Sequence, residues 1–134
     1  MNKTKRSFLK VIADNKPGAL AEIARLLARV KINIDDMTAI GFGEKGLVIL
    51  LASDHVKAAQ ILQDHGYSVL SDQGFVVKLE NKPGTMAKVT GLLAKNGVNI
   101  SAISAIGKAK GFCYFVLTAD NMKKARKLLK EYIV

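Results

Sequence analysis

The sequence of 134 residues holds only one cysteine, Cys113, so a disulfide within the chain is excluded. This cysteine usage is typical of a reducing compartment. The thiol lies between Phe112 and Tyr114 in an apolar run, which predicts a buried structural cysteine and not a reactive one.

Long hydrophobic runs are also missing from the chain. No apolar stretch approaches the roughly 20 residues that a membrane-spanning helix needs. The basic start Met1–Arg6 is like the first part of a signal peptide, but Lys10 and Asp14 interrupt the apolar run that follows, and no small-residue cleavage site comes after it. We therefore expect a cytoplasmic, ordered globular protein without a membrane as partner.

A recognisable catalytic, metal or cofactor set is absent as well. His55 and His65 are ten residues apart, which fits neither one helical face nor a metal motif. Asp35-Asp36 are neighbours on a predicted strand and so point to opposite faces. Gly41–Gly46 matches G-x-G-x-x-G, but a strand follows it where the dinucleotide motif requires a helix. We interpret this glycine motif as a hairpin turn, and we expect no enzyme and no cofactor.

What the sequence does contain is a duplication. Residues 14–41 align with residues 80–107 without a gap and with 13 identities in 28 positions. The loop Asn15-Lys16-Pro17-Gly18 returns as Asn81-Lys82-Pro83-Gly84. One such repeat, occurring twice, indicates a small duplicated module and not a solenoid.

Each copy predicts the same order of elements. Ser7–Ala13 reads as a strand, and helical spacing of apolar residues follows from Pro17 onward, with Pro17 in the first turn. Two strands follow, then a second helix with Asp54 or, in the repeat, Asp120 as N-cap, and then a fourth strand at Tyr67–Leu70. Gly97 suits the end of the first helix of the second copy, whereas Lys31 at the matching position predicts a less regular helix end.

The predicted fold class is therefore α+β, with two tandem ferredoxin-like βαββαβ modules, antiparallel sheets and helices on one face. The modules are expected to span residues 1–72 and 73–134, with the last strand of the second one truncated. The inner strands Leu47–Leu51 and Phe112–Leu117 are apolar at nearly every position, which indicates that both sheet faces are covered. We expect a homodimer.

The duplicated loops are the candidate ligand site. A loop that leads into a helix N-terminus offers unpaired amides to an anion, and asparagine can both donate and accept. Together they suit the carboxylate and ammonium of a free amino acid. The candidate binding residues are Asn15, Pro17, Gly18, Ala19, Leu20, Asn33 and Ile34 in the first copy and Asn81, Pro83, Gly84, Thr85, Met86, Asn99 and Ile100 in the second.

Two other interpretations remain open. The asparagines can simply build turns and begin strands. The formal charge is +2 over residues 1–72 and +8 over residues 73–134, so a basic segment could instead make a constitutive protein- or nucleic-acid-docking module. Exposed aromatic residues are not interleaved with these charges, which makes nucleic acid the less favoured partner. The segment contains Lys123, Lys124, Arg126, Lys127 and Lys130.

The loop, the helix and the asparagine-bearing strand resemble the ACT domain, a regulatory module that binds small molecules. The resemblance rests on Asn-Lys-Pro-Gly-Ala-Leu with Val-Lys-Ile-Asn-Ile, and on Asn-Lys-Pro-Gly-Thr-Met with Asn-Gly-Val-Asn-Ile. The resemblance covers nearly the whole chain. The chain is similar to tandem ACT proteins of the amino-acid-binding, acetolactate-synthase-like type. The resemblance implies a non-enzymatic allosteric sensor that binds a free amino acid between paired modules and modulates an enzyme of amino-acid metabolism. Loop residues Asn15 and Asn81 and strand residues Asn33 and Asn99 would then contact the ligand, and the backbone near Gly18 and Gly84 would close the site.

Overall fold

The computed structural model describes residues 5–134 and contains two compact units, one formed by Ser7–Asp72 and one that contains Gln73–Val134. The first four residues, which belong to the basic start of the chain, lie outside the described range.

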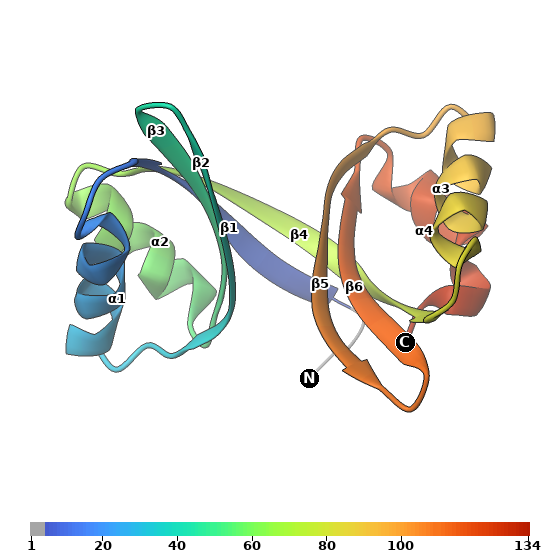
Figure 1. The fold of residues 1–134 in the computed structure, drawn as a ribbon, viewed down its shortest axis with the longest axis horizontal. Coiled ribbons are helices and arrows are strands. Elements are labelled where there is room, and N and C mark those ends of the chain that lie inside the picture. Colours follow the sequence, from blue (N-terminus) through green and yellow to red (C-terminus); the bar gives the residue numbers. More distant parts are fainter. Residues whose placement is uncertain (1–4) are drawn as a thin grey trace. The chain divides into compact units, whose positions relative to one another are not determined.

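The first unit has a four-stranded antiparallel core with two helices on one of its faces (Figure 1). Its strands are ordered β2-β3-β1-β4, as in a ferredoxin-like module. The hairpin interpretation of the glycine motif is confirmed, because β2 ends at Phe42 and β3 begins at Lys45. The elements are β1 (Lys5–Asp14), α1 (Ala19–Arg29), β2 (Ile34–Phe42), β3 (Lys45–Ala52), α2 (His55–Asp64) and the beginning of β4 (Ser68–Glu80).

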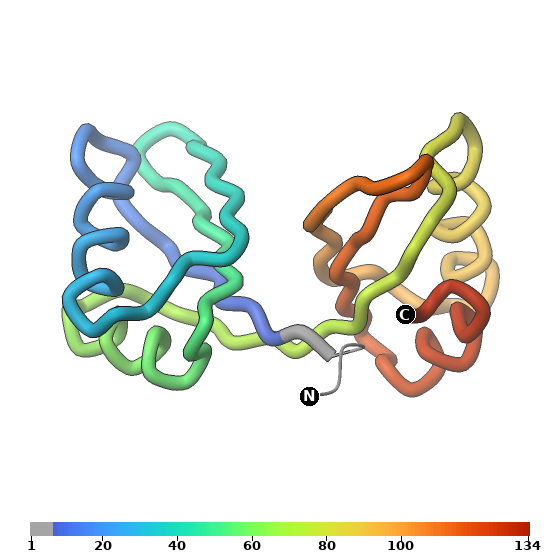
Figure 2. The backbone as a smooth tube through the Cα atoms, turned by 90° about the horizontal axis from the view of Figure 1, so that it is seen from below, coloured from blue at the N-terminus to red at the C-terminus, as the bar shows by residue number. Residues whose placement is uncertain are grey.

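The second unit repeats this order, and its chain path is easily followed in the tube view (Figure 2). Its strand order is β4-β6-β5, and its last segment contributes a single antiparallel bridge between Ile133 and Val77. The expected α+β class with two βαββαβ modules, antiparallel strands and helices on one face is confirmed. The elements are the remainder of β4, α3 (Thr85–Lys95), β5 (Ile100–Ala109), β6 (Phe112–Ala119), α4 (Met122–Leu128) and a 3₁₀ turn (Lys130–Tyr132).

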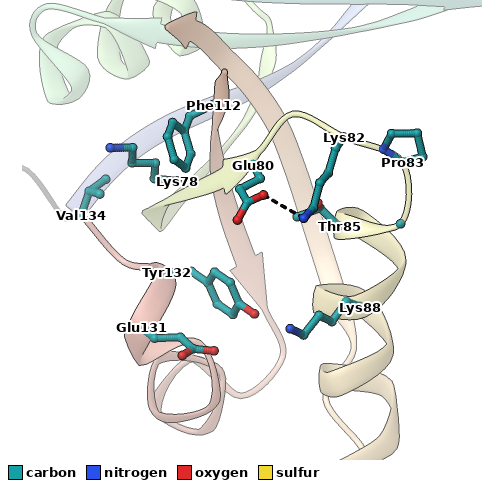
Figure 3. A pocket seen from close by; sticks show the side chains of 11 residues that line it. Lys78, Glu80, Lys82, Pro83, Thr85, Lys88, Phe112, Glu131, Tyr132 and Val134 are labelled. Atoms are coloured by element: carbon teal, nitrogen blue, oxygen red, sulfur yellow. Dashed lines mark ion pairs between the residues drawn. The ribbon is translucent and has the colours of Figure 1, made fainter. Parts of the chain in front are cut away.

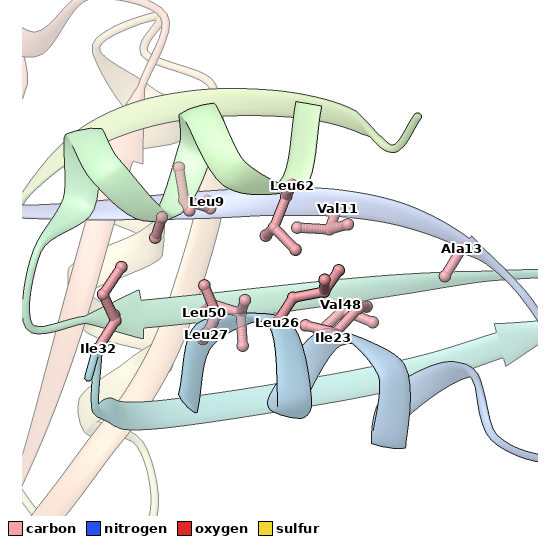
Figure 4. Packing of buried hydrophobic residues seen from close by; sticks show 11 residues of the cluster. Leu9, Val11, Ala13, Ile23, Leu26, Leu27, Ile32, Val48, Leu50 and Leu62 are labelled. Atoms are coloured by element: carbon pink, nitrogen blue, oxygen red, sulfur yellow. The ribbon is translucent and has the colours of Figure 1, made fainter. Parts of the chain in front are cut away.

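Each unit has its own hydrophobic core between its strands and its helices. In the first unit, Leu9, Val11 and Leu50 of the strands meet Leu27 of α1 and Leu62 of α2 (Figure 4). The second unit repeats this pattern with residues that are equally buried. Its core contains Phe75, Val77, Leu79, Val89, Leu93, Val98, Leu117, Ala119, Ala125 and Leu129.

The strand positions that face away from the helices in the first unit are apolar but only partly covered. Leu47 is half-buried, and its neighbours across the sheet, Ile12 and Ile40, are 44% and 48% exposed. An apolar face of this kind is the basis of the expected pairing with a second copy of the chain, which stays a prediction.

The two copies differ by one inserted residue in β5. Strand β2 has one irregularity in its pairing with β3, between Ile34 and Asp36, whereas β5 has two in its pairing with β6. The second of these lies between Ala105 and Gly107 and leaves Ile106 as a bulge. Beyond this point, matching residues are 67 positions apart and no longer 66.

The predicted cap of α4, Asp120, is wrong because this inserted residue shifts the cap position by one. The N-cap is Asn121, whose side chain accepts a hydrogen bond from the Lys124 amide, and not Asp120. Asp120 instead accepts from the Asn99 amide at 3.0 Å, as Ser53 does from Asn33 in the first unit. The predicted cap of α2, Asp54, is confirmed.

The expectation of a less regular end of α1 at Lys31 is wrong. The amides of Lys31 and Ile32 bond to Ala28 and Leu27, as those of Gly97 and Val98 bond to Ala94 and Leu93. Both helices therefore end with the same backbone geometry.

Lys31 reaches this geometry with a φ of 59°, in the left-handed region that side chains disfavour. We expect Lys31→Gly to raise the free energy of unfolding by about 1 kcal/mol, because glycine adopts this φ without strain. Urea denaturation measures the change. As a control, Gly97→Lys in the second unit should lower the stability by a similar amount. Equal stability of Lys31→Gly and the wild type would contradict the argument.

Candidate functional site

The two loops of the repeat lead into helices whose N-termini lack a side-chain cap. Gly18 before α1 has a φ of 89° and Gly84 before α3 a φ of 92°, and neither position supplies a capping hydrogen bond. The other two helices are capped by Asp54 and Asn121. The first amide of each helix, that of Ala19 or Thr85, bonds to the carbonyl of Lys16 or Lys82. Among the α-helices of residues 5–134, the next amides of the first turn and the helix dipole thus stay open to a ligand only at the duplicated loops. Because a left-handed glycine cannot continue a helix, α1 begins at Ala19 and Pro17 lies in the preceding turn, not in the first helical turn.

In the first unit, the loop lies against the β2–β3 hairpin. The backbone amide of Asn15 bonds to the Glu44 carbonyl at 2.8 Å, and its side-chain Nδ2 donates to the Gly43 carbonyl at 2.9 Å. Gly41 lies so close that a Cβ there would be 2.6 Å from Asn15 Nδ2. A cavity of about 330 Å³ is formed here, and Gly18, Ala19 and Leu20 from the expected set line it together with Asn15.

The structure does not bring Asn33 or Ile34 to this loop within the same unit. They follow α1, whereas Asn15 precedes it, and eleven helical residues span roughly 16 Å. Asn33 Nδ2 donates to Asp35 Oδ1 at 2.8 Å, and Ile34 packs against the hydrophobic core. Asn99 and Ile100 occupy the same place after α3 in the second unit.

The loop of the second unit also lies against a hairpin, but its asparagine side chain makes fewer hydrogen bonds than that of the first unit. The Asn81 amide bonds to the Gly111 carbonyl at 2.8 Å. In the described part of the chain, the side chains of Asn81 and Asn99 make no hydrogen bond to another residue, unlike those of Asn15 and Asn33. Asn81, Thr85 and Met86 line a small cavity of about 100 Å³.

A larger cavity of about 510 Å³ opens on the other side of the second loop, where Pro83, Gly84 and Thr85 meet the C-terminal segment (Figure 3). Within residues 5–134, the Thr85 hydroxyl is buried and finds no hydrogen-bond partner. The corresponding cavity of the first unit, about 430 Å³, is lined by Pro17, Gly18 and Ala19.

Charged groups in the first unit neutralise one another beside the loop. Lys45 Nζ lies 2.7 Å from Asp14 Oδ1, and this ion pair lowers the pKa of Asp14 and raises that of Lys45. The Tyr67 hydroxyl donates to Glu22 on α1. Burial, together with this hydrogen bond, raises the pKa of Tyr67 to about 12, so the phenol stays protonated.

Sequence reasoning missed the residues that enclose the two larger cavities. In the first unit these include Glu22, Lys45 and Tyr67, and in the second Lys78 and Lys88. The alignment of the copies held a signal, since Glu22 in one copy aligns with Lys88 in the other. In the basic segment, the exposed Lys123, Lys124 and Lys127 lie elsewhere, on α4, and the exposed Lys130 begins the 3₁₀ turn. Arg126 lies over the Phe75 ring at 5.1 Å.

The described residues hold no group of three or more His, Cys, Asp or Glu side chains that could bind a metal ion. Cys113 is buried, as predicted. None of the helices between residues 5 and 134 has the length and apolar character needed to cross a membrane.

The chain matches the ACT domain pair family over residues 5–133, and it belongs to that family. No curated protein matches it.

Among solved structures, the chain is similar to protein BT0572 from Bacteroides thetaiotaomicron, with 27% identity and a TM-score of 0.82, covering 100% of this chain and 94% of that one. The regulatory subunit of aspartate kinase from Thermus thermophilus, in its ligand-free form, has the same fold, with 16% identity, a TM-score of 0.69 and coverage of 98% and 95%. The corresponding subunit from Thermus flavus is 17% identical, with a TM-score of 0.68 and coverage of 96% and 92%. The resemblance to the two kinase subunits concerns the fold alone.

Proposed function

We propose that this chain is a non-enzymatic regulatory protein that binds a free amino acid at its duplicated loops and thereby modulates a partner enzyme. The observation that carries the proposal is the pair of uncapped helix N-termini at Gly18 and Gly84, each beside a cavity, whereas the α-helices α2 and α4 are capped.

The chemistry of the loops suits a zwitterion. Amides of the first helical turn and the positive end of the helix dipole attract a carboxylate. A carboxamide oxygen, such as that of Asn81, can accept from an ammonium group. The helix N-terminus and the asparagine carboxamide are found together at both loops. One loop lies in residues 1–72 and the other in residues 73–134, which we take as the two ACT modules.

The second module is the better candidate for ligand binding. In the first, the Asn15 and Asn33 carboxamides already donate to Gly43 and Asp35, which supports a structural role for them. A ligand at Asn81 would not have to displace such a bond.

Regulation and assembly are part of the proposal. Proteins of this fold include the regulatory subunits of aspartate kinase named above, which supports an enzyme of amino-acid metabolism as the partner. Because Asn33 and Asn99 lie far from the loop of their own module, another module would have to supply an asparagine at this position, and we take it to be a module of a second chain. A ligand that binds better to one arrangement of the paired chains shifts the population toward it.

The test is a thermal-shift screen of the purified protein against the common amino acids at millimolar concentration. A ligand at about 100 times its Kd should stabilise the protein by about 2.7 kcal/mol. For a ligand whose ammonium group bonds to Asn81, Asn81→Ala should weaken binding about tenfold, because a hydrogen bond to a charged group is lost. Asn15→Ala is the matched control in the first module. If no amino acid shifts the melting temperature, the proposal fails.

The docking alternative is supported by the exposure of Lys123, Lys124 and Lys127 on α4. Retention on an anionic nucleic acid column that disappears in modest salt, without sequence preference, would reduce this to non-specific charge.

A further inference from the structure

The cavity of about 510 Å³ in the second unit is surrounded by charged side chains from four parts of the chain (Figure 3). Lys78 and Glu80 come from the end of β4, Lys82 from the loop, and Lys88 from α3. Glu131 and Tyr132 come from the C-terminal segment, and the side chains of Lys88 and Tyr132 point toward one another.

Three lysines and two glutamates thus line the same cavity, and not all of these charged side chains form ion pairs with one another. Lys82 Nζ lies 2.9 Å from Glu80 Oε2, and Lys78 Nζ lies 4.3 Å from the centre of the Phe112 ring. Between residues 5 and 134, Lys88 and Glu131 have no ion-pair partner within 4.0 Å. The side chains that line the cavity carry an excess of one positive charge, to which the N-terminus of α3 adds its dipole.

The corresponding cavity of the first unit has the same place in the fold but a different charge. Ile12 takes the place of Lys78, and Glu22 takes the place of Lys88. Lys16 and Lys45 both lie beside Asp14, and Glu22 accepts from Tyr67. The charges of its two lysines and two carboxylates cancel, so an excess of positive side-chain charge is found in the cavity of the second copy and not in that of the first.

We propose that the cavity of the second unit binds an acidic amino acid, aspartate or glutamate, in preference to neutral ones. This inference rests on the proposed function, assigns its ligand class, and puts the ligand in the cavity of about 510 Å³ and not in the smaller cavity that Asn81 lines. The two carboxylates of such a ligand match the three ammonium groups and the first-turn amides of α3, and its ammonium matches Glu80 and Glu131. A ligand with net charge −1 complements lining side chains with a net charge of +1, whereas a purely anionic ligand would leave both glutamates opposed to it.

Isothermal titration calorimetry at physiological salt tests the preference with isosteric pairs. We expect aspartate to bind about tenfold more tightly than asparagine, and glutamate than glutamine, because the side-chain amide forms weaker hydrogen bonds with lysine than a carboxylate does. Succinate, which lacks the ammonium group, should bind less tightly than aspartate. Equal binding of succinate and aspartate would overturn the assignment to an amino acid.

The decisive variant is Lys88→Glu, which places the residue of the first copy in the second cavity. It should abolish the preference for aspartate over asparagine, and the fold should persist because an acidic residue is favourable in the first turns of a helix. Lys88→Gln, which removes the charge without reversing it, should reduce the preference part of the way. Lys124→Glu, on the exposed face of α4, changes the net charge equally and should leave the preference intact.

The outcomes separate this inference from the function on which it rests. Binding of neutral amino acids as tight as that of acidic ones, or a preference that survives Lys88→Glu, overturns the inference and leaves the proposed function standing. Absence of binding by every amino acid overturns both.

Discussion

Leu93→Ala is expected to lower the free energy of unfolding by about 2–5 kcal/mol. Leu93 lies on α3, is completely buried, and packs in the core of the second unit. Its removal takes apolar surface out of the core and leaves a cavity that the surrounding strands cannot fill. Urea denaturation followed by circular dichroism measures the loss.

Leu27 occupies the same place on α1 in the first unit and is equally buried, so Leu27→Ala is the matched variant. The two losses should be of similar size. A loss below about 1 kcal/mol for either variant would contradict the assignment of that leucine to a tightly packed core.

The second large effect is expected at Gly74 of β4. A Cβ at this position would lie 2.7 Å from Val116 Cγ1 and 2.8 Å from the backbone oxygen of Leu117. The carbonyl belongs to the paired strand β6 and cannot move without disturbing the sheet. We therefore expect Gly74→Ala to cost about 1–3 kcal/mol in stability, again measured by urea denaturation.

Gly107 on β5 provides the control for this substitution. A Cβ at Gly107 meets no atom within 4 Å, so Gly107→Ala should change the stability by no more than about 0.5 kcal/mol. If the two variants were equally stable, steric exclusion at Gly74 would be ruled out.

The fold was largely predictable from the sequence because the duplication repeats every local signal. Apolar spacing, the glycines of the loops and Asp54 as a cap all predicted elements that the structure contains. The cap of α4 was assigned to the wrong residue, since a gap-free alignment cannot reveal a bulge at Ile106. The strand predicted over residues 67–70 is the beginning of β4, which continues without interruption to Glu80.

The candidate site was predictable only in part. The uncapped loops at Gly18 and Gly84 follow from local sequence, because they depend on a few adjacent residues. The cavity of the second unit depends on Lys78, Lys88 and Tyr132, which come together only when β4, α3 and the C-terminal segment are packed. A difference of charge between the copies is visible in the sequence, but its concentration in one cavity is not.

The bulge at Ile106 has a consequence for how this chain could diversify. An inserted residue was absorbed by β5, and the loop at Asn81 still bonds to the hairpin at Gly111 as Asn15 does to Glu44. A residue added to the hairpin is thus accommodated as a bulge in the strand, and the loop that leads into the helix keeps its hydrogen bond to the hairpin.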